Sequence, residues 1–177
     1  MTERAVAASL GRLRLADKGF DEEHLLLVDL RPRLAGMPEE RARALPQTLL
    51  PAVQALPGVR TVSLSVYPLL GESGWSRRLS VPGVTPKGQF QQTPVNAVTP
   101  GYFQTVGVRL LRGREFTPAD RKGAPRVTII NEALARQLFP GVDPVGQRLY
   151  DGDPHDHPTD MTVVGVVADV RARQLGK

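Results

Sequence analysis

Glycine and proline divide the stretch from residue 100 to residue 116 into very short segments. Its sequence is PGYFQTVGVRLLRGREF, with glycines at positions 101, 107 and 113. Glycine readily adopts the left-handed backbone conformation that ends a helix, and proline suits the first turn of one. The spacing therefore predicts a strand, a short helix and a second strand. No pair of residues in this stretch could perform catalysis together, so we interpret its glycines and prolines as structural.

Similar turn signals continue to the end of the chain. We expect strands over 93–99, 108–113, 126–130 and 161–170. Thr99 and Thr117 each precede a proline, and we expect both to cap short helices. Asn131 is expected to cap a longer helix over 132–139, which Pro140 and the following glycine end.

The N-terminal half predicts a β-α-β unit. Residues 24–32 (HLLLVDLRP) form an apolar run typical of a buried strand, and residues 59–67 alternate like a second strand. The helix expected between them, over 38–58, places its apolar side chains on one face: Ala42, Leu45, Leu49, Val53 and Leu56. Pro46 and Pro51 should bend this helix or delay its start, because an interior proline removes a backbone hydrogen bond.

Residues 68–92 are rich in glycine, proline and serine, which predicts a long connection carrying one short strand near 77–81. Trp75 lies in this connection and is the only tryptophan of the chain. We expect it to cap the core rather than to lie exposed at a contact surface, since single tryptophans are mostly buried.

Composition excludes several classes of function. The chain has no cysteine, so disulfides, thiolate metal sites and a cysteine nucleophile are excluded. The formal charge of +5 comes from basic residues scattered among acidic ones, which argues against nucleic-acid binding. No apolar run approaches the ~18 residues of a membrane span, and residues 1–20 lack the apolar core of a signal peptide. We therefore expect the chain as given to be soluble.

One loop has the residue types of a metal site. Residues 151–160 (DGDPHDHPTD) contain four aspartates and two histidines, namely Asp151, Asp153, His155, Asp156, His157 and Asp160. Their spacing matches no known ligand pattern, and such loops are usually solvated connectors. Phosphate-binding glycine motifs and nucleophile motifs are absent from the sequence. His24, at the start of an apolar run, is expected to be a hydrogen-bonded surface histidine rather than a catalytic base.

Three stretches in a fixed order resemble a known family. They are NAVTPGYFQTVGVRLLRGREFTPAD, VTIINEALARQLFPGVDPVGQRL and TVVGVVADVR, and all three lie within residues 93–173, which the resemblance covers. The order is similar to that of the periplasmic core domain of MacB-like, FtsX-related ABC transporter permeases, and most similar to the acidobacterial-type branch. The matching positions, expected to be structural, are Gly101, Tyr102, Phe103, Gly107, Gly113, Arg114, Phe116, Asn131, Glu132, Phe139, Pro140, Pro144, Gly146 and Gly165.

The resemblance implies an α+β fold with four parts. Residues 1–20 would be a lead segment, either helical or flexible, and 21–72 the first half of a porter-like β-α-β unit. Residues 73–92 would be a connector, and 93–177 a mixed α/β sabre-like part. Because the sequence ends where the family continues into a second β-α-β unit, we expect an exposed apolar face or an open sheet edge on the first unit.

The resemblance also implies a function without chemistry. The domain would lie on the periplasmic side of the inner membrane and couple ATP-driven motion to substrate export or to a periplasmic partner. Its partners would be the rest of the permease, an ATP-binding subunit or domain, a second permease copy, and an adaptor or outer-membrane component. No catalytic residue, cofactor or metal is implied. The alternatives are a free-standing ligand- or metal-binding module that uses residues 151–160, and an unrecognised hydrolase.

Overall fold

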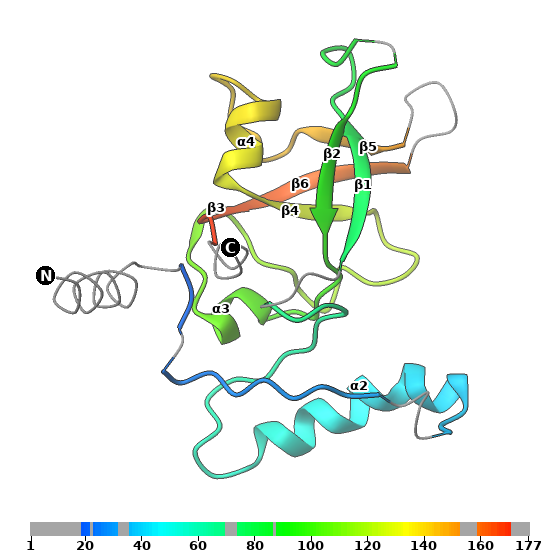
Figure 1. Cartoon of the computed structure of the whole chain (residues 1–177), viewed down its shortest axis with the longest axis vertical. Coiled ribbons are helices and arrows are strands. Elements are labelled where there is room, and N and C mark those ends of the chain that lie inside the picture. Colours follow the sequence, from blue (N-terminus) through cyan, green and yellow to red (C-terminus); the bar gives the residue numbers. More distant parts are fainter. Residues whose placement is uncertain are drawn as a thin grey trace, which may run out of the picture.

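The computed structural model describes residues 19–21, 23–31, 36–69, 74–86, 88–152 and 159–170. These residues form a mixed α/β fold around one sheet (Figure 1). The strands are β1 (Trp75–Ser80), β2 (Gln91–Val95), β3 (Leu110–Gly113), β4 (Val127–Asn131), β5 (Arg148–Asp151) and β6 (Thr159–Val167). The helices are α2 (Glu39–Gln54), α3 (Tyr102–Val106) and α4 (Glu132–Leu138). The expected α+β class is confirmed.

Strand β6 organises the sheet. It pairs in parallel with β4 and antiparallel with β5 and β3, while β1 joins β5 to the edge strand β2. Its second half, VVGVV over 163–167, is apolar and mostly buried, as expected for a strand with neighbours on both sides and covered faces. The expected buried strand over 161–170 is therefore present, but it starts at Thr159 and ends at Val167.

Two apolar clusters form the core. The first joins the sheet to α4 and contains the fully buried Leu149 and Val163. The second lies around α3 and contains Tyr102, Val106, Val108 and Val167. Because Val166 belongs to the first cluster and Val167 to the second, adjacent residues of β6 connect the two. The sheet, α3 and α4 are thus a packed body.

The β-α-β prediction is only partly correct. Helix α2 begins at Glu39 and continues through Pro46 and Pro51 as one helix, so a late start is wrong. Residues 25–31 are not a strand and are mostly exposed, and residues 59–67 contain a single bridge, Ser65 to Val98. A strand needs a neighbour for its backbone hydrogen bonds, and within the described part of the chain neither segment has one along its length.

Three local expectations are also wrong. Thr99 does not cap α3, because its side chain accepts a hydrogen bond from the Leu64 amide instead. Residues after Thr117 form a turn, not a helix. Trp75 is 53% exposed and makes an edge-to-face contact with Tyr67, so it does not cap the core.

Ser80 is the one buried polar residue among those described, and its hydroxyl has no hydrogen-bond partner there. A buried hydroxyl without a partner loses its water contacts and gains nothing in return. We expect Ser80→Ala to leave the free energy of unfolding unchanged or to raise it by up to about 1 kcal/mol. Urea unfolding would test this, and a loss of more than that amount would contradict it. Thr85→Ala is the matched control, since that hydroxyl accepts from the Val81 amide and its loss should destabilise.

Candidate functional site

An apolar strip lies exposed on the extended segment before α2. It consists of Leu26, Leu27, Val28 and Leu30, and Leu26 is 85% exposed. In an extended chain alternate residues share a face, so Leu26, Val28 and Leu30 point to the same side. Contiguous exposed apolar side chains of this kind mark contact surfaces in soluble domains. The apolar strip is therefore the first candidate for a functional surface.

The region around the strip has no core of its own. No described residue between positions 23 and 69 is buried, and α2 buries none of its side chains. The apolar face expected on α2 is present but only half covered, and Leu56 at its end is 54% exposed. The expectation of an exposed apolar face on this unit agrees with these exposures.

Two attachments hold this region to the sheet body. The first is a short set of hydrogen bonds between residues 64–67 and 96–99, in which the Val66 amide donates to the Ala97 carbonyl at 2.9 Å. The second is at Asp21, whose amide donates to the Val106 carbonyl at 3.0 Å. Phe20 and Leu25 pack beside it against the α3 cluster. The two attachments lie just before and just at the end of α3, which in Figure 1 lies between α2 and the sheet.

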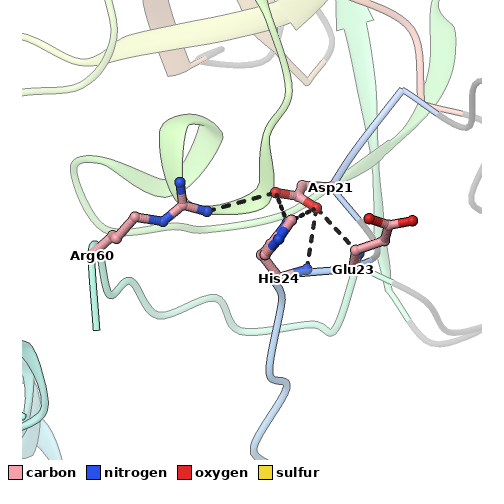
Figure 2. Close-up of polar contacts among 4 residues, drawn as sticks. All are labelled: Asp21, Glu23, His24 and Arg60. Atoms are coloured by element: carbon pink, nitrogen blue, oxygen red, sulfur yellow. Dashed lines mark hydrogen bonds and ion pairs between the residues drawn. The ribbon is translucent and has the colours of Figure 1, made fainter. Parts of the chain in front are cut away.

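The Asp21 carboxylate organises the second attachment (Figure 2). It accepts hydrogen bonds from the amides of Glu23 and His24 and lies 3.2 Å from His24 Nδ1. Arg60 approaches to 4.0 Å from the other segment. The hydrogen bond with the His24 side chain is the largest cause that lowers the pKa of Asp21. His24 is thus the hydrogen-bonded surface histidine expected from the sequence.

Glu115 caps α3 from a distant position. Helix α3 follows Gly101, which offers no side chain as a cap, and the Phe103 and Gln104 amides would otherwise lack acceptors. The Glu115 carboxylate accepts from the Phe103 amide at 2.7 Å and from the Gln104 amide at 3.3 Å. The negative charge also suits the positive end of the helix. Glu115 therefore fixes α3 onto the turn that follows β3.

We expect Glu115→Ala to lower the free energy of unfolding by about 1–2 kcal/mol, the usual range for losing a helix cap. Glu40→Ala is the matched control, because Glu40 is exposed in the first turn of α2 and accepts no side-chain hydrogen bond within the described part of the chain. Urea denaturation of both variants checks this. Equal effects of the two substitutions would contradict the capping role.

Asp120 closes the turn after Glu115. Its carboxylate accepts from Arg114 Nη1 at 2.7 Å and Nη2 at 2.9 Å, and from the Thr117 amide at 2.8 Å. The hydrogen bonds from Arg114, followed by the one from the Thr117 amide, hold the pKa of Asp120 well below its ordinary value of 3.8. This bidentate ion pair needs the two terminal nitrogens of an arginine, which explains the residue type at position 114.

The lowered pKa of Asp120 predicts that the stability of the folded chain falls at acid pH. A carboxylate whose pKa falls on folding stabilises the native state at pH values above its unfolded pKa, and this stabilisation is lost as pH falls through the folded pKa. The contribution should therefore be complete above pH 3.8 and decline below it. Asp120→Asn should flatten the stability profile below that pH. An unchanged acid limb in urea titrations would contradict the assignment.

Two glycines bring β3 and β6 together. Gly113 lies opposite Gly165 in the ladder. A Cβ atom on Gly113 would overlap the Val164 carbonyl, and one on Gly165 would overlap the Arg114 carbonyl. Gly113 also has a φ of +72°, which side-chain-bearing residues rarely adopt. The strands can approach this closely only because both positions lack side chains.

A shared cap fixes α4 to the end of β6. The Asn131 side chain accepts from the Leu134 amide, as the sequence predicts. Asp169 adds a second acceptor, since it receives hydrogen bonds from Asn131 Nδ2 at 2.7 Å, the Ala133 amide and Arg136. The helix and the strand end therefore move as one unit.

The other positions singled out by the sequence lie in packing or turn roles. Tyr102, Phe139 and Pro144 are buried, and Phe103 contacts the rings of Tyr102 and Phe116. Gly101, Gly107 and Gly146 have positive φ angles. Glu132 pairs with Arg136, and Pro140 borders a groove of about 570 Å³ between α4 and β3. The structure does not gather these residues into one site.

Metal-ligating side chains are dispersed among the described residues. No group of three metal-ligating side chains occurs among them. Of the acidic loop, Asp151 pairs with Arg77 and Asp160 with Arg148. Asp153, His155, Asp156 and His157 lie outside the described residues. The groove beside α4 is lined by apolar side chains and by charges that largely pair with one another, such as Arg136 with Glu132.

Sequence reasoning missed Asp21, Glu115 and Asp169. Each accepts hydrogen bonds from backbone amides of another segment or of the next turn. Glu115 and Asp169 act across 11 to 38 positions, and no local motif reports such a distance. The role of Asp21 could have been predicted, because an aspartate in a loop commonly accepts hydrogen bonds from backbone amides about two residues later and forms an Asx turn.

Comparisons with known proteins agree on one family. Residues 8–176 match the model of the MacB-like periplasmic core domain. The chain is 30% identical over 137 residues to the probable syringafactin export ATP-binding/permease protein SyfD of Pseudomonas syringae pv. tomato, covering 76% of this chain and 18% of that protein. It is 31% identical over 144 residues to a probable export ATP-binding/permease protein of Pseudomonas fluorescens, covering 80% of this chain and 20% of that protein.

A solved structure shares the fold. The periplasmic region of MacB from Actinobacillus actinomycetemcomitans superposes with a TM-score of 0.50 at 18% identity, over 70% of this chain and 50% of that one. The chain thus spans about a fifth of the curated relatives and half of the solved region. Within the described part of the chain, no helix has both the length and the apolar character needed to cross a bilayer.

Proposed function

This chain belongs to the family of MacB-like periplasmic core domains, and from that premise we propose that it acts without chemistry of its own, as the mechanical link of an export permease. The domain would transmit ATP-driven motion of the transporter to the export of a substrate or to a periplasmic partner. The exposed apolar strip is the observation that carries this proposal, because it offers a surface for the rest of a longer protein.

We propose a division of the chain that its packing supports. We propose that residues 21–72 are the first half of a porter-like unit and that residues 93–177 are a sabre-like part, with 73–92 as the connector. The described residues between 23 and 69 have no core, whereas the sheet with α3 and α4 has two apolar clusters. A region with a half-covered helix face gains stability when a further layer covers it.

The apolar strip fits a partner from the same polypeptide. Residues 25–31 are extended and lack a neighbouring strand in the described part of the chain. Addition of a strand would satisfy their backbone groups and cover Leu26 and Val28 in one step. We therefore propose that a later segment of the permease completes a sheet on this segment.

The proposed partners follow from the relatives. Their names join an ATP-binding part to a permease part. We propose that this domain works with such an ATP-binding subunit or domain and with a second permease copy, on the periplasmic side of the inner membrane. An adaptor or outer-membrane component would be a further partner. No cofactor is required by this role.

Two experiments test the proposal. The coding DNA on both sides of this reading frame should encode one membrane helix upstream, and a second β-α-β unit followed by three membrane helices downstream. In liposomes containing the complete transporter, deletion of residues 75–170 should abolish export while leaving basal ATP hydrolysis measurable. Flanks that encode no membrane segment, or export that survives the deletion, would overturn the proposal.

A further inference from the structure

We infer that Asp21 and Gly107 form a joint that sets the angle between the α2 region and the sheet body. The α2 region here means residues 23–31 and 36–63, and the sheet body means β1–β6 with α3 and α4. The joint is a property of the fold, and the inference does not rest on the export function proposed above.

The backbones of Asp21 and Gly107 approach each other closely. A Cβ atom on Gly107 would lie 2.8 Å from both the amide nitrogen and the Cβ of Asp21. Gly107 also has a φ of +73° and ends α3. Only glycine therefore lets the incoming chain cross the end of α3 at this distance, where the Asp21 amide reaches the Val106 carbonyl.

The Asp21 side chain then turns the chain toward α2. Its carboxylate accepts from the amides two and three residues later, those of Glu23 and His24, which fixes the direction in which residues 25–31 leave the sheet body. Arg60 approaches the same carboxylate at 4.0 Å from the chain that returns after α2. One carboxylate thus contacts both the outgoing and the returning segments of the α2 region (Figure 2).

A second attachment makes this joint decisive for orientation. Residues 64–67 pair with 96–99, so the α2 region is held at two places. Two attachments, one at each end of α3, restrict rotation to the line through both, whereas one attachment alone permits rotation in any direction about it. Since no residue of the α2 region is buried, packing adds little to hold the angle once the joint is lost.

The test measures the distance between one label on the α2 region and one on the sheet body, which changes when the angle between the two changes. The chain has no cysteine, so spin labels can be placed at Gln47→Cys on α2 and Gln92→Cys on β2 without other changes. In this background, double electron–electron resonance should report one narrow distance population. Gly107→Val should replace it with a broad distribution, and Asp21→Ala should broaden it to a smaller extent.

Matched controls separate the joint from general strain. Gly101→Val places a side chain at a similar φ of +79° at the other end of α3, where a Cβ atom has nothing within 4 Å, and should keep the narrow population. Asp29→Ala removes an exposed ion pair with Arg31 and should also keep it. If Gly107→Val fails to fold by circular dichroism, Asp21→Ala decides. A broad distribution in the parent, or a narrow one in Asp21→Ala, would overturn the inference.

Discussion

Gly165→Ala is expected to lower the free energy of unfolding by about 3 kcal/mol or more. Its Cβ would overlap the Arg114 carbonyl and crowd the Leu110 side chain. The obstructing atom is backbone within the β3–β6 ladder, so it can move only if the pairing opens. Because β6 connects both apolar clusters, a local opening there also disturbs the core. Urea unfolding followed by circular dichroism measures the loss.

The matched control is Gly74→Ala, where an added Cβ meets nothing within 4 Å and the backbone is not left-handed. It should change stability by no more than about 0.5 kcal/mol. Gly113→Ala adds backbone strain to the overlap and should be at least as damaging as Gly165→Ala. Equal stability of the Gly165 and Gly74 variants would show that the two strands are not held at this distance.

The apolar strip predicts an effect that depends on context. The triple variant Leu26→Ser, Val28→Thr and Leu30→Ser should leave the stability of the isolated chain within about 0.5 kcal/mol, since these side chains are already exposed. In the complete permease the same change should destabilise the periplasmic domain by roughly 5 kcal/mol, because burial of each large apolar side chain contributes about 1.5–3 kcal/mol. Thermal unfolding of both proteins, with export assays, measures the difference.

The control for this prediction is Val84→Thr. Val84 is 67% exposed, like Val28, but lies in the connection between β1 and β2. It should be neutral in both proteins. A strip variant that is equally neutral in the complete permease would mean that the strip stays exposed there.

The sequence predicted the sheet body better than the α2 region. The strand over Val127–Asn131, the cap at Asn131 and the helix after it follow from local signals, and the structure has all three. Residues 24–32 read as a buried strand because Leu and Val side chains follow one another without interruption. The composition is that of a strand, but burial needs a covering layer, which the described part of the chain does not place there.

The two wrong capping predictions concern the hydrogen-bond partner. Thr99 and Thr117 each have the residue type of a cap, yet the Thr99 hydroxyl accepts from the Leu64 amide and the Thr117 hydroxyl donates to the Asp120 carboxylate. Conversely, Glu115 has no local signal and caps α3 through the fold. For Thr99 and Glu115 the tertiary structure brings the partner amide near, whereas Thr117 meets a nearby carboxylate, so local sequence predicts the capping residue type better than it predicts the partner.

Hydrogen exchange of the amides of residues 25–31 tests whether the apolar strip joins this domain to the rest of the permease. It should be measured by mass spectrometry on peptides shared by the isolated chain and the complete permease. We expect rapid exchange in the isolated chain, where residues 25–31 are mostly exposed and pair with no strand among the described residues. We expect strong protection in the complete permease, where a strand covers them. Rapid exchange in both proteins would contradict the claim that this surface joins the domain to the rest of the transporter.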